Sequence, residues 1–227
     1  MILGRTVSAI ITTYRRYATL DQVVASWLAQ PVDQLWVLDG GGRYKPGVMA
    51  DPRLLTFRMP ADLGTKMDYA FALLTEGDLV CLADDDIVVS PGFLEDLERT
   101  RGETGGIVGI IGRTFHGPKY WGETKFFRAS DLRSPERVGF VGCVYLASRE
   151  LFGFDVRGCP RNCDDLWWEM RAHPDVPKHV APTARYKNLP TASDPEAMYH
   201  TPRLRAQREA FYREHYLRTY APAGRIY

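Results

Sequence analysis

Three adjacent carboxylates, Asp84-Asp85-Asp86, come directly after the apolar run of residues 79–83, which indicates a buried strand. Three like charges side by side are unfavourable unless a cation shares them. Aspartate oxygens are hard ligands that suit Mg²⁺ or Mn²⁺. Open α/β sheets bind ligands beyond the carboxyl ends of their strands. The run therefore predicts a divalent metal at a sheet edge, with a phosphate-bearing ligand completing its coordination. A solvated turn is the alternative.

The first half of the chain alternates strand and helix patterns. β-Branched and apolar residues predict strands ahead of the aspartate run, over residues 6–13, 35–39 and 54–57. Apolar residues at helical spacing predict helices that begin at Thr19, at Asp62 and at Ser90-Pro91. Strands that alternate with helices of this length predict βα units and a mainly parallel sheet.

After about residue 105 the alternation is less regular. Strands are predicted over residues 107–111, 125–128 and 138–146, and a helix over residues 164–171. Residues 173–202 are rich in proline and predict a loop, and residues 203–220 predict a basic amphipathic helix. We expect one domain over residues 1–227, made of an N-terminal half (1–105), a second half (106–200) and a C-terminal helix and tail (201–227).

Length and composition fit one large globular domain, or a domain with an elaborated C-terminal part. The 227 residues are 45% hydrophobic, enough for a sizeable core. Net charge is +1, but residues 1–112 hold 10 Lys/Arg against 15 Asp/Glu, and the remainder holds 19 against 13. An acidic, metal-binding half beside a basic half fits an anionic ligand between them. Ordinary surface variation is the competing explanation.

Other features predict a soluble, cytoplasmic protein of bacterial or phage-like type. No apolar stretch approaches the ~20 residues of a membrane span, and the N-terminus lacks a signal-peptide layout. The four cysteines are few for a disulfide scaffold, which favours reduced thiols. Cys159 and Cys163 lack a second Cys/His pair with the spacing of a zinc site.

Several segments together resemble a known family. Three segments precede the Asp run: Thr12-Thr13-Tyr14-Arg15-Arg16, Asp39-Gly40-Gly41 and Gly64-Thr65-Lys66. Two segments follow it: Gly139-Phe140-Val141-Gly142 and Asn162-Cys163-Asp164-Asp165. In this order they resemble the GT-A glycosyltransferases of family 2, over about residues 5–170. The last segment also resembles exostosin-like transferases.

The resemblance implies a fold and an activity. The fold is α/β, with a Rossmann-type, mainly parallel central sheet, flanking helices and a C-terminal helical extension. The implied activity is metal-dependent transfer of a sugar from a nucleoside diphosphate sugar to an acceptor hydroxyl. We expect a UDP-sugar donor and Mn²⁺ or Mg²⁺. The resemblance further implies that the N-terminal half (1–105) binds the nucleotide sugar and the second half (106–200) the acceptor.

On the donor side, the resemblance implies that the triplet forms a DXD motif. Asp84 bonds the ribose, Asp86 is the direct metal ligand, and Asp85 supports the turn. The metal bridges both phosphates and neutralises charge on the leaving diphosphate. Five more residues are expected around the nucleotide: Thr12, Tyr14 and Arg15 along the pocket, Asp39 at the base or ribose, and Lys66 at a phosphate. For these residues a loop, turn or solvated-surface role is the alternative.

On the acceptor side, the resemblance points to Asp165, with Asp164 beside it, as the base that deprotonates the attacking hydroxyl in an inverting transferase. Retaining exostosin-like enzymes give the equivalent acid no such clear role. The chain departs from family 2 in having Asp-Asp where Glu-Asp is common. A helix start with acid in its first turn is the structural alternative. Many GT-A enzymes take a further ligand from a C-terminal histidine, for which His200 is chosen over His179 and His215.

The acceptor is less defined. Bases and aromatics interleave at Lys119, Tyr120, Trp121, Lys125, Phe126, Phe127 and Arg128. That composition suits sugar stacking and equally a nucleic-acid strand, so we expect a glycan or small molecule first and a hydroxymethylated, flipped-out DNA base second.

Two other functions remain as alternatives. A nucleotidyltransferase acting on sugar phosphates would carry a glycine-rich loop after the first strand, and the segment that begins at Thr12 lacks those glycines. A nucleotide-sugar-binding module without turnover is the second alternative.

Overall fold

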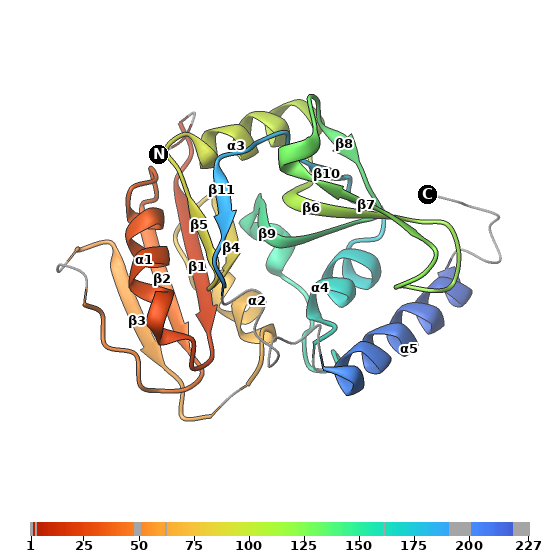
Figure 1. Cartoon of the computed structure of the whole chain (residues 1–227), viewed down its shortest axis with the longest axis horizontal. Helices are drawn as coiled ribbons and strands as arrows, with labels where there is room; N and C mark the ends of the chain where they lie inside the picture. Colours follow the sequence, from red (N-terminus) through yellow and green to blue (C-terminus); the bar gives the residue numbers. More distant parts are fainter. Residues whose placement is uncertain are drawn as a thin grey trace.

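The computed structural model describes residues 2, 4–47, 51–61, 63–160, 162–190 and 201–219. Its described residues form a nine-stranded sheet of order β3-β2-β1-β4-β9-β6-β10-β8, with β7 beside β6 (Figure 1). The first four strands in that order run parallel to one another. They are β3 (Leu54–Arg58), β2 (Gln34–Asp39), β1 (Val7–Thr13) and β4 (Leu79–Asp84).

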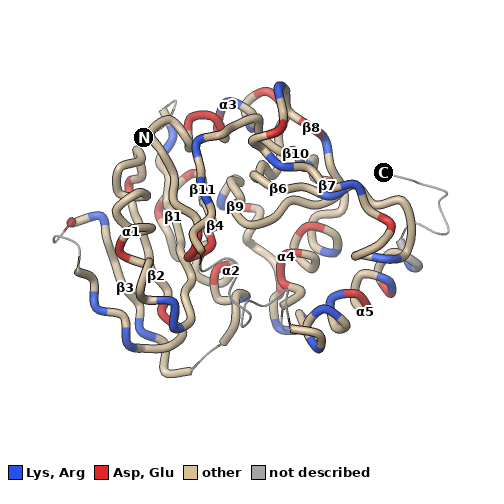
Figure 2. The backbone as a smooth tube through the Cα atoms, in the orientation of Figure 1, with Lys and Arg blue, Asp and Glu red and all other residues tan. Residues whose placement is uncertain are grey.

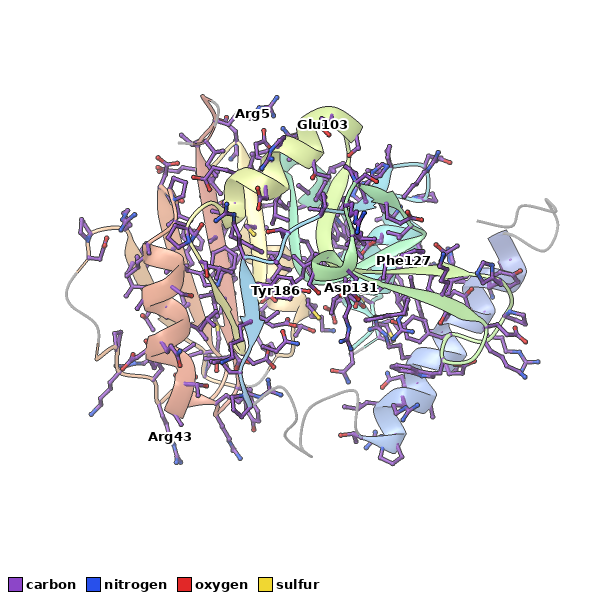
Figure 3. All side chains as sticks on the ribbon, turned by 45° about the horizontal axis from the view of Figure 1, so that its top comes forward. Arg5, Arg43, Glu103, Phe127, Asp131 and Tyr186 are labelled. Atoms are coloured by element: carbon purple, nitrogen blue, oxygen red, sulfur yellow. The ribbon has the colours of Figure 1, made fainter. Side chains whose placement is uncertain are left out.

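The second half of the sheet is mixed. β9 (Phe140–Ser148) is antiparallel to both β4 and β6 (Ile107–Phe115). β10 (Lys178–Val180) is parallel to β6. β8 (Glu136–Arg137) is antiparallel to β10, and β7 (Thr124–Arg128) is antiparallel to β6. A separate two-stranded sheet joins β5 (Ile87–Val89) to β11 (Tyr186–Asn188). In Figure 3, Tyr186 of β11 lies on the side of the first half and Phe127 of β7 on the side of the second.

Five α-helices and three helical segments of other types flank the sheet in the part of the chain described. The first three helices belong to βα units, and α5 lies beside α4, away from the first four strands (Figure 1). Their bounds are α1 (Tyr17–Leu28), α2 (Lys66–Ala72), α3 (Phe93–Thr104), α4 (Asp164–Leu166) and α5 (Pro202–Thr219). The turns are 3₁₀ at η1 (Ala129–Asp131) and η2 (Arg149–Phe152), and π-helical at η3 (Trp167–Ala172), which continues α4.

The main core lies on both faces of the parallel strands. All but the ends of β1, β2 and β4 are buried, which suits their β-branched and apolar sequences. Trp168 is fully buried and stacks on Phe152, with ring centroids 4.8 Å apart. Trp167, its neighbour, is half-buried and stacks instead on Phe211 of α5.

A second, smaller cluster holds α5 in place. It consists of Phe115, Tyr120, Phe140, Leu166, Met170 and Tyr212. The Tyr212 ring lies 4.4 Å from that of Phe115, and its hydroxyl donates to the Gly117 carbonyl at 2.9 Å. The C-terminal helix is therefore packed onto β6, β9 and α4.

The predicted fold class is confirmed, with local corrections. The helix expected from Thr19 begins at Tyr17, and the helix expected from Asp62 begins at Lys66, while Asp62 itself lies outside the described residues. The helix expected at Ser90-Pro91 begins only after Gly92, whose left-handed conformation (φ 87°) turns the chain. The predicted loop over 173–202 contains β10 and β11. The sequence did not predict these strands because three residues are too few to show a strand pattern. Among the described residues, no helix is both long and apolar enough to cross a bilayer.

Candidate active site

The carboxyl ends of three parallel strands bring the predicted donor residues to one sheet edge. In register, Thr12 of β1 lies opposite Asp84 of β4, and Thr13 opposite Asp39 of β2. Figure 2 shows acidic segments near the ends of β4 and α2 and at α4. The topology alone therefore places the end of β1 between two predicted ligand-binding carboxylates.

Arg16 is the counter-ion of the aspartate run. Its Nη1 lies 3.0 Å from Oδ1 of Asp85 and 2.8 Å from Oδ2 of Asp86. Asp85 also accepts a hydrogen bond from the Thr13 hydroxyl at 2.7 Å. Asp85 and Asp86 are buried in the turn between β4 and β5, whereas Asp84 is exposed at the strand end. The sequence analysis predicted a role for Arg15 and gave none to its neighbour Arg16.

The run carries more negative charge than this one guanidinium balances. Loss of water around Asp84, and then the charges of Asp86 and Asp85, raise the pKa of Asp84 well above its usual range. Asp84 is partly exposed, yet the protein atoms packed around its carboxyl displace enough water to disfavour its charge. Burial also raises the pKa values of Asp85 and Asp86, against the opposing effect of Arg16. These carboxylates favour a further cation.

Cys143 joins the aspartate run to the second half of the sheet. It has a left-handed backbone (φ 69°), close to the point where the β6–β9 register shifts. Its thiol donates a hydrogen bond to the Asp84 carboxyl. Burial, and then the charges of Asp84 and Asp86, raise the pKa of the thiol well above its usual range. Cys143 therefore acts as a neutral donor to Asp84. Its charge environment also includes Asp165.

The residues fit a hard divalent cation as part of a shared ligand set. The oxygens of Asp84 and Asp86 have the right chemistry, and the uncompensated charge favours a cation. Within the described part of the chain, no group of three or more His, Cys, Asp or Glu side chains could hold a metal alone. The remaining ligands would have to come from a bound diphosphate. His200 lies outside the described residues.

Asp68 is a further buried acid that the sequence analysis missed. It accepts a hydrogen bond from the Thr12 hydroxyl, and burial, together with the charges of Asp164 and Asp85, raises its pKa well above the usual range. It belongs to the buried face of α2 with Tyr69 and Ala72. An aspartate among apolar residues at helical spacing was the one signal available.

Asp164 and Asp165 lie side by side at the start of α4 but have different partners. Asp164 is buried and accepts a 2.7 Å hydrogen bond from the Thr65 hydroxyl. Burial, and then the charge of Asp165, raise the pKa of Asp164 to about 6. Asp165 is paired on both oxygens with Arg208 of α5, at 2.7 and 2.5 Å. Asp165 also accepts from the Leu166 amide at 2.7 Å. Both acids lie in the first turn of α4, as the structural alternative expected, whereas Cys163 at the N-cap makes no side-chain capping hydrogen bond.

The other residues predicted to surround the nucleotide differ in exposure and in their partners. Tyr14 and Arg15 are exposed, with the Arg15 guanidinium 4.8 Å from the Tyr14 ring centroid. Lys66 Nζ donates to the Cys159 carbonyl at 3.4 Å, next to the approach to α4.

Asp39 is fully buried and organises its own loop. It accepts from the Tyr17 hydroxyl at 2.8 Å, the Gly41 amide at 2.9 Å and the Tyr44 amide at 2.6 Å. A side chain at Gly41 would collide with the Tyr17 hydroxyl, so glycine is required there. In this structure the carboxylate of Asp39 therefore performs the turn-forming role that the sequence left as an alternative.

All four cysteines are free thiols, as expected.

Solved structures share this fold. A crystal structure of GalNAc-T7 with UDP, GalNAc and Mn²⁺ matches with a TM-score of 0.62 and 11% identity, over 97% of this chain and 51% of that one. S. aureus TarS 1-349 matches with a TM-score of 0.55 and 14% identity, over 96% of this chain and 74% of that one. At these identities the likeness establishes the fold. The chain spans about half the length of the GalNAc-T7 chain.

Among curated proteins, none matches the sequence significantly. The family model described as "Glycosyl transferase family 2" matches residues 8–153, which is more than half of the chain. This match includes the aspartate run and the β9 segment, and the GT-A architecture agrees with it. The chain therefore belongs to glycosyl transferase family 2 and has the expected GT-A fold.

Proposed function

We propose that this enzyme transfers a sugar from a UDP-sugar to an acceptor hydroxyl with the help of Mn²⁺ or Mg²⁺. One observation supports this most strongly: the aspartate run and the Asp164-Asp165 pair belong to one charge cluster. Asp68 is influenced by both Asp85 and Asp164, and Cys143 by both Asp84 and Asp165. A donor-side group and an acceptor-side base must share one site to act on one anomeric carbon.

On the donor side, we assign Asp84 to the ribose, Asp86 to the metal and Asp85 to support of the turn. The contacts of Asp85 with Thr13 and Arg16 support the last assignment. The metal, when bound, supplies Lewis-acid stabilisation of the leaving diphosphate. The GalNAc-T7 crystal contained UDP and Mn²⁺, which supports the choice of donor and metal. The remaining assignments are Thr12, Tyr14, Arg15, Asp39 and Lys66 around the nucleotide, and His200 as a further metal ligand.

On the acceptor side, we assign Asp165 as the base, with Asp164 as its neighbour. The acceptor oxygen forms a bond to the anomeric carbon while the bond to the diphosphate breaks, and the hydroxyl proton passes to the carboxylate. The half-buried Asp165 is more accessible than Asp164, which Thr65 holds. A pKa of about 6 for Asp164 nevertheless suits a base, so Asp164 is the second candidate.

For the acceptor, we propose a glycan or small molecule. The Arg113 guanidinium lies 5.0, 5.3 and 5.1 Å from the ring centroids of Tyr120, Trp121 and Phe126. The Phe126 ring is 41% exposed and could stack on a sugar. A hydroxymethylated DNA base is the second candidate, favoured by the same mixture of cations and rings. The free thiols are compatible with action in the cytoplasm of a bacterium or a phage-infected cell.

A turnover assay tests the proposal. UDP release from a panel of UDP-sugars, with Mn²⁺ and with glycan or hydroxymethylated-DNA acceptors, should occur with the wild type. Asp165→Asn should retain UDP binding and lose at least 100-fold in turnover, the usual contribution of a general base. Full activity of this variant would transfer the role to Asp164, which Asp164→Asn then tests. Release of pyrophosphate from a nucleoside triphosphate would indicate nucleotidyl transfer, and binding without any release would indicate a binding module.

A further inference from the structure

Arg208 of α5 reaches the proposed base from a different part of the chain. Its Nη1 lies 2.7 Å from Oδ1 of Asp165 and its Nη2 lies 2.5 Å from Oδ2, a two-pronged ion pair. The two side chains are only 14% and 16% exposed. Such a pair fixes the plane of the carboxylate as well as its charge.

The guanidinium is held in place on its other sides. Nη1 also donates to the Asn162 carbonyl at 3.0 Å, in the loop that leads into α4. The charged group lies 4.9 Å from the Tyr120 ring centroid and 5.4 Å from that of Phe140. These aromatic faces attract a cation and exclude water from the ion pair. Arg208 therefore has little freedom to leave Asp165.

The position of α5 is itself fixed next to Arg208. Glu209 accepts hydrogen bonds from the backbone amides of Tyr120 and Trp121, both at 3.2 Å. Tyr212, one turn further along, is fully buried in the aromatic cluster. The helix thus presents Arg208 to Asp165 from a rigid support.

In the described part of the chain, the titratable groups around Asp165 other than Arg208 carry no positive charge. Arg208 is the only cation in contact with Asp165 among the described residues. The other titratable groups whose environment includes Asp165 are neutral or acidic: Asp164, Glu169, Cys159 and Cys163 near α4, Tyr69 of α2, Tyr120, and Cys143 and Tyr145 of β9. Without the guanidinium, Asp165 would face the adjacent carboxyl of Asp164 uncompensated.

We propose that Arg208 is a positioning residue that fixes the place and plane of the Asp165 carboxylate, so that α5 is an integral part of the active site. The catalytic meaning of this contact rests on the proposed function, whereas the contact itself can be tested without it.

The test is a pH titration of the Asp165 carboxyl signal by carbon NMR in the full chain, with the signal assigned from Asp165→Asn. In Arg208→Gln the titration midpoint should move to higher pH by about one unit or more, because the ionised form loses its partner. Arg208→Lys should show a smaller shift, since a single ammonium restores charge without the fork. Arg213→Gln, an exposed change on the same helix, should show none.

An unchanged midpoint in both Arg208 variants would overturn the inference, and the lysine variant decides it if the glutamine variant fails to fold. Turnover separates this inference from the proposed function. If Asp165 is the base, the acidic limb of the pH–rate profile should move with the midpoint. A midpoint that moves while the limb stays fixed supports the role of Arg208 and contradicts Asp165 as base. Absence of UDP-sugar turnover in the wild type contradicts the proposed function, and the titration still decides the role of Arg208.

Discussion

Buried carboxylates near the site are expected to destabilise the fold at neutral pH. The pKa of Asp164 is about 6, above the ordinary aspartate value of 3.8, because burial and the charge of Asp165 disfavour its ionised form. Between these two values the folded chain binds a proton that the unfolded chain has released. This contribution to stability is therefore present at low pH and is lost as the pH rises towards 6.

Asp164→Asn should accordingly stabilise the protein above pH 6. Asparagine can still accept the Thr65 hydrogen bond, and it removes the buried charge. Urea unfolding at pH 7.5 should show a gain of about 1–3 kcal/mol, which largely disappears at pH 4.5. Asp131→Asn, an exposed aspartate, is the control and should change stability little at either pH. A loss of stability at pH 7.5 would contradict this account.

Arg16 connects the stability of the aspartate run to metal binding. Arg16→Gln leaves Asp85 and Asp86 without their guanidinium, and breaking such a partly buried ion pair costs about 3 kcal/mol. Mn²⁺ should then raise the unfolding temperature of the variant more than that of the wild type, because it meets the unbalanced charge. Thermal unfolding with and without Mn²⁺ measures both effects. Equal Mn²⁺-induced shifts in the two proteins would show that Arg16 and the metal do not share these carboxylates.

The acids of the site, Asp84–Asp86 and Asp164-Asp165, could be predicted from the sequence, whereas the residues that contact them could not. Acids after an apolar run are visible in one short segment, because the pattern and the charges are local. Arg16, Thr65, Asp68 and Arg208 are polar residues in otherwise ordinary helical surroundings. Their partners lie 43 to 99 positions away along the chain, so only the folded sheet reveals them.

At the scale of elements, α5 depends on the aromatic cluster around Tyr212. Tyr212→Ala should destabilise the protein by about 3–5 kcal/mol, the usual cost of emptying a large buried aromatic site. Tyr212→Phe removes only the hydrogen bond to Gly117 and should cost about 1 kcal/mol. Hydrogen exchange should show faster opening of α5 in the alanine variant. Equal exchange in all three proteins would mean that other contacts hold the helix.

The elements were predictable to different degrees. Strands β1, β2, β3 and β4 were predicted to within one residue at almost every end, because long β-branched runs between glycines and prolines leave little ambiguity. β6 extends four residues beyond Ile111, the predicted end, since Gly112, Arg113 and Thr114 interrupt the apolar pattern while still pairing with β7. The three-residue strands β5, β10 and β11 owe their conformation to their neighbours in the sheet.

At the scale of the whole molecule, the two halves of the chain meet at the carboxylates. The parallel order β3-β2-β1-β4 follows from successive βα units. The insertion of β9 between β4 and β6 is a long-range pairing that no local pattern specifies. It brings Cys143 against Asp84 and thereby joins the aspartate run to the second half of the sheet.

Calorimetric titration with UDP, with and without Mn²⁺, tests the central claim most directly. The wild type should bind UDP at least tenfold more tightly with Mn²⁺, and Asp86→Ala should abolish that difference while leaving metal-free binding nearly unchanged. Asp131→Asn, on an exposed turn, should behave like the wild type. UDP binding that does not depend on the metal in the wild type, or a metal dependence that survives Asp86→Ala, would contradict a metal-assisted nucleotide-sugar site at the end of β4.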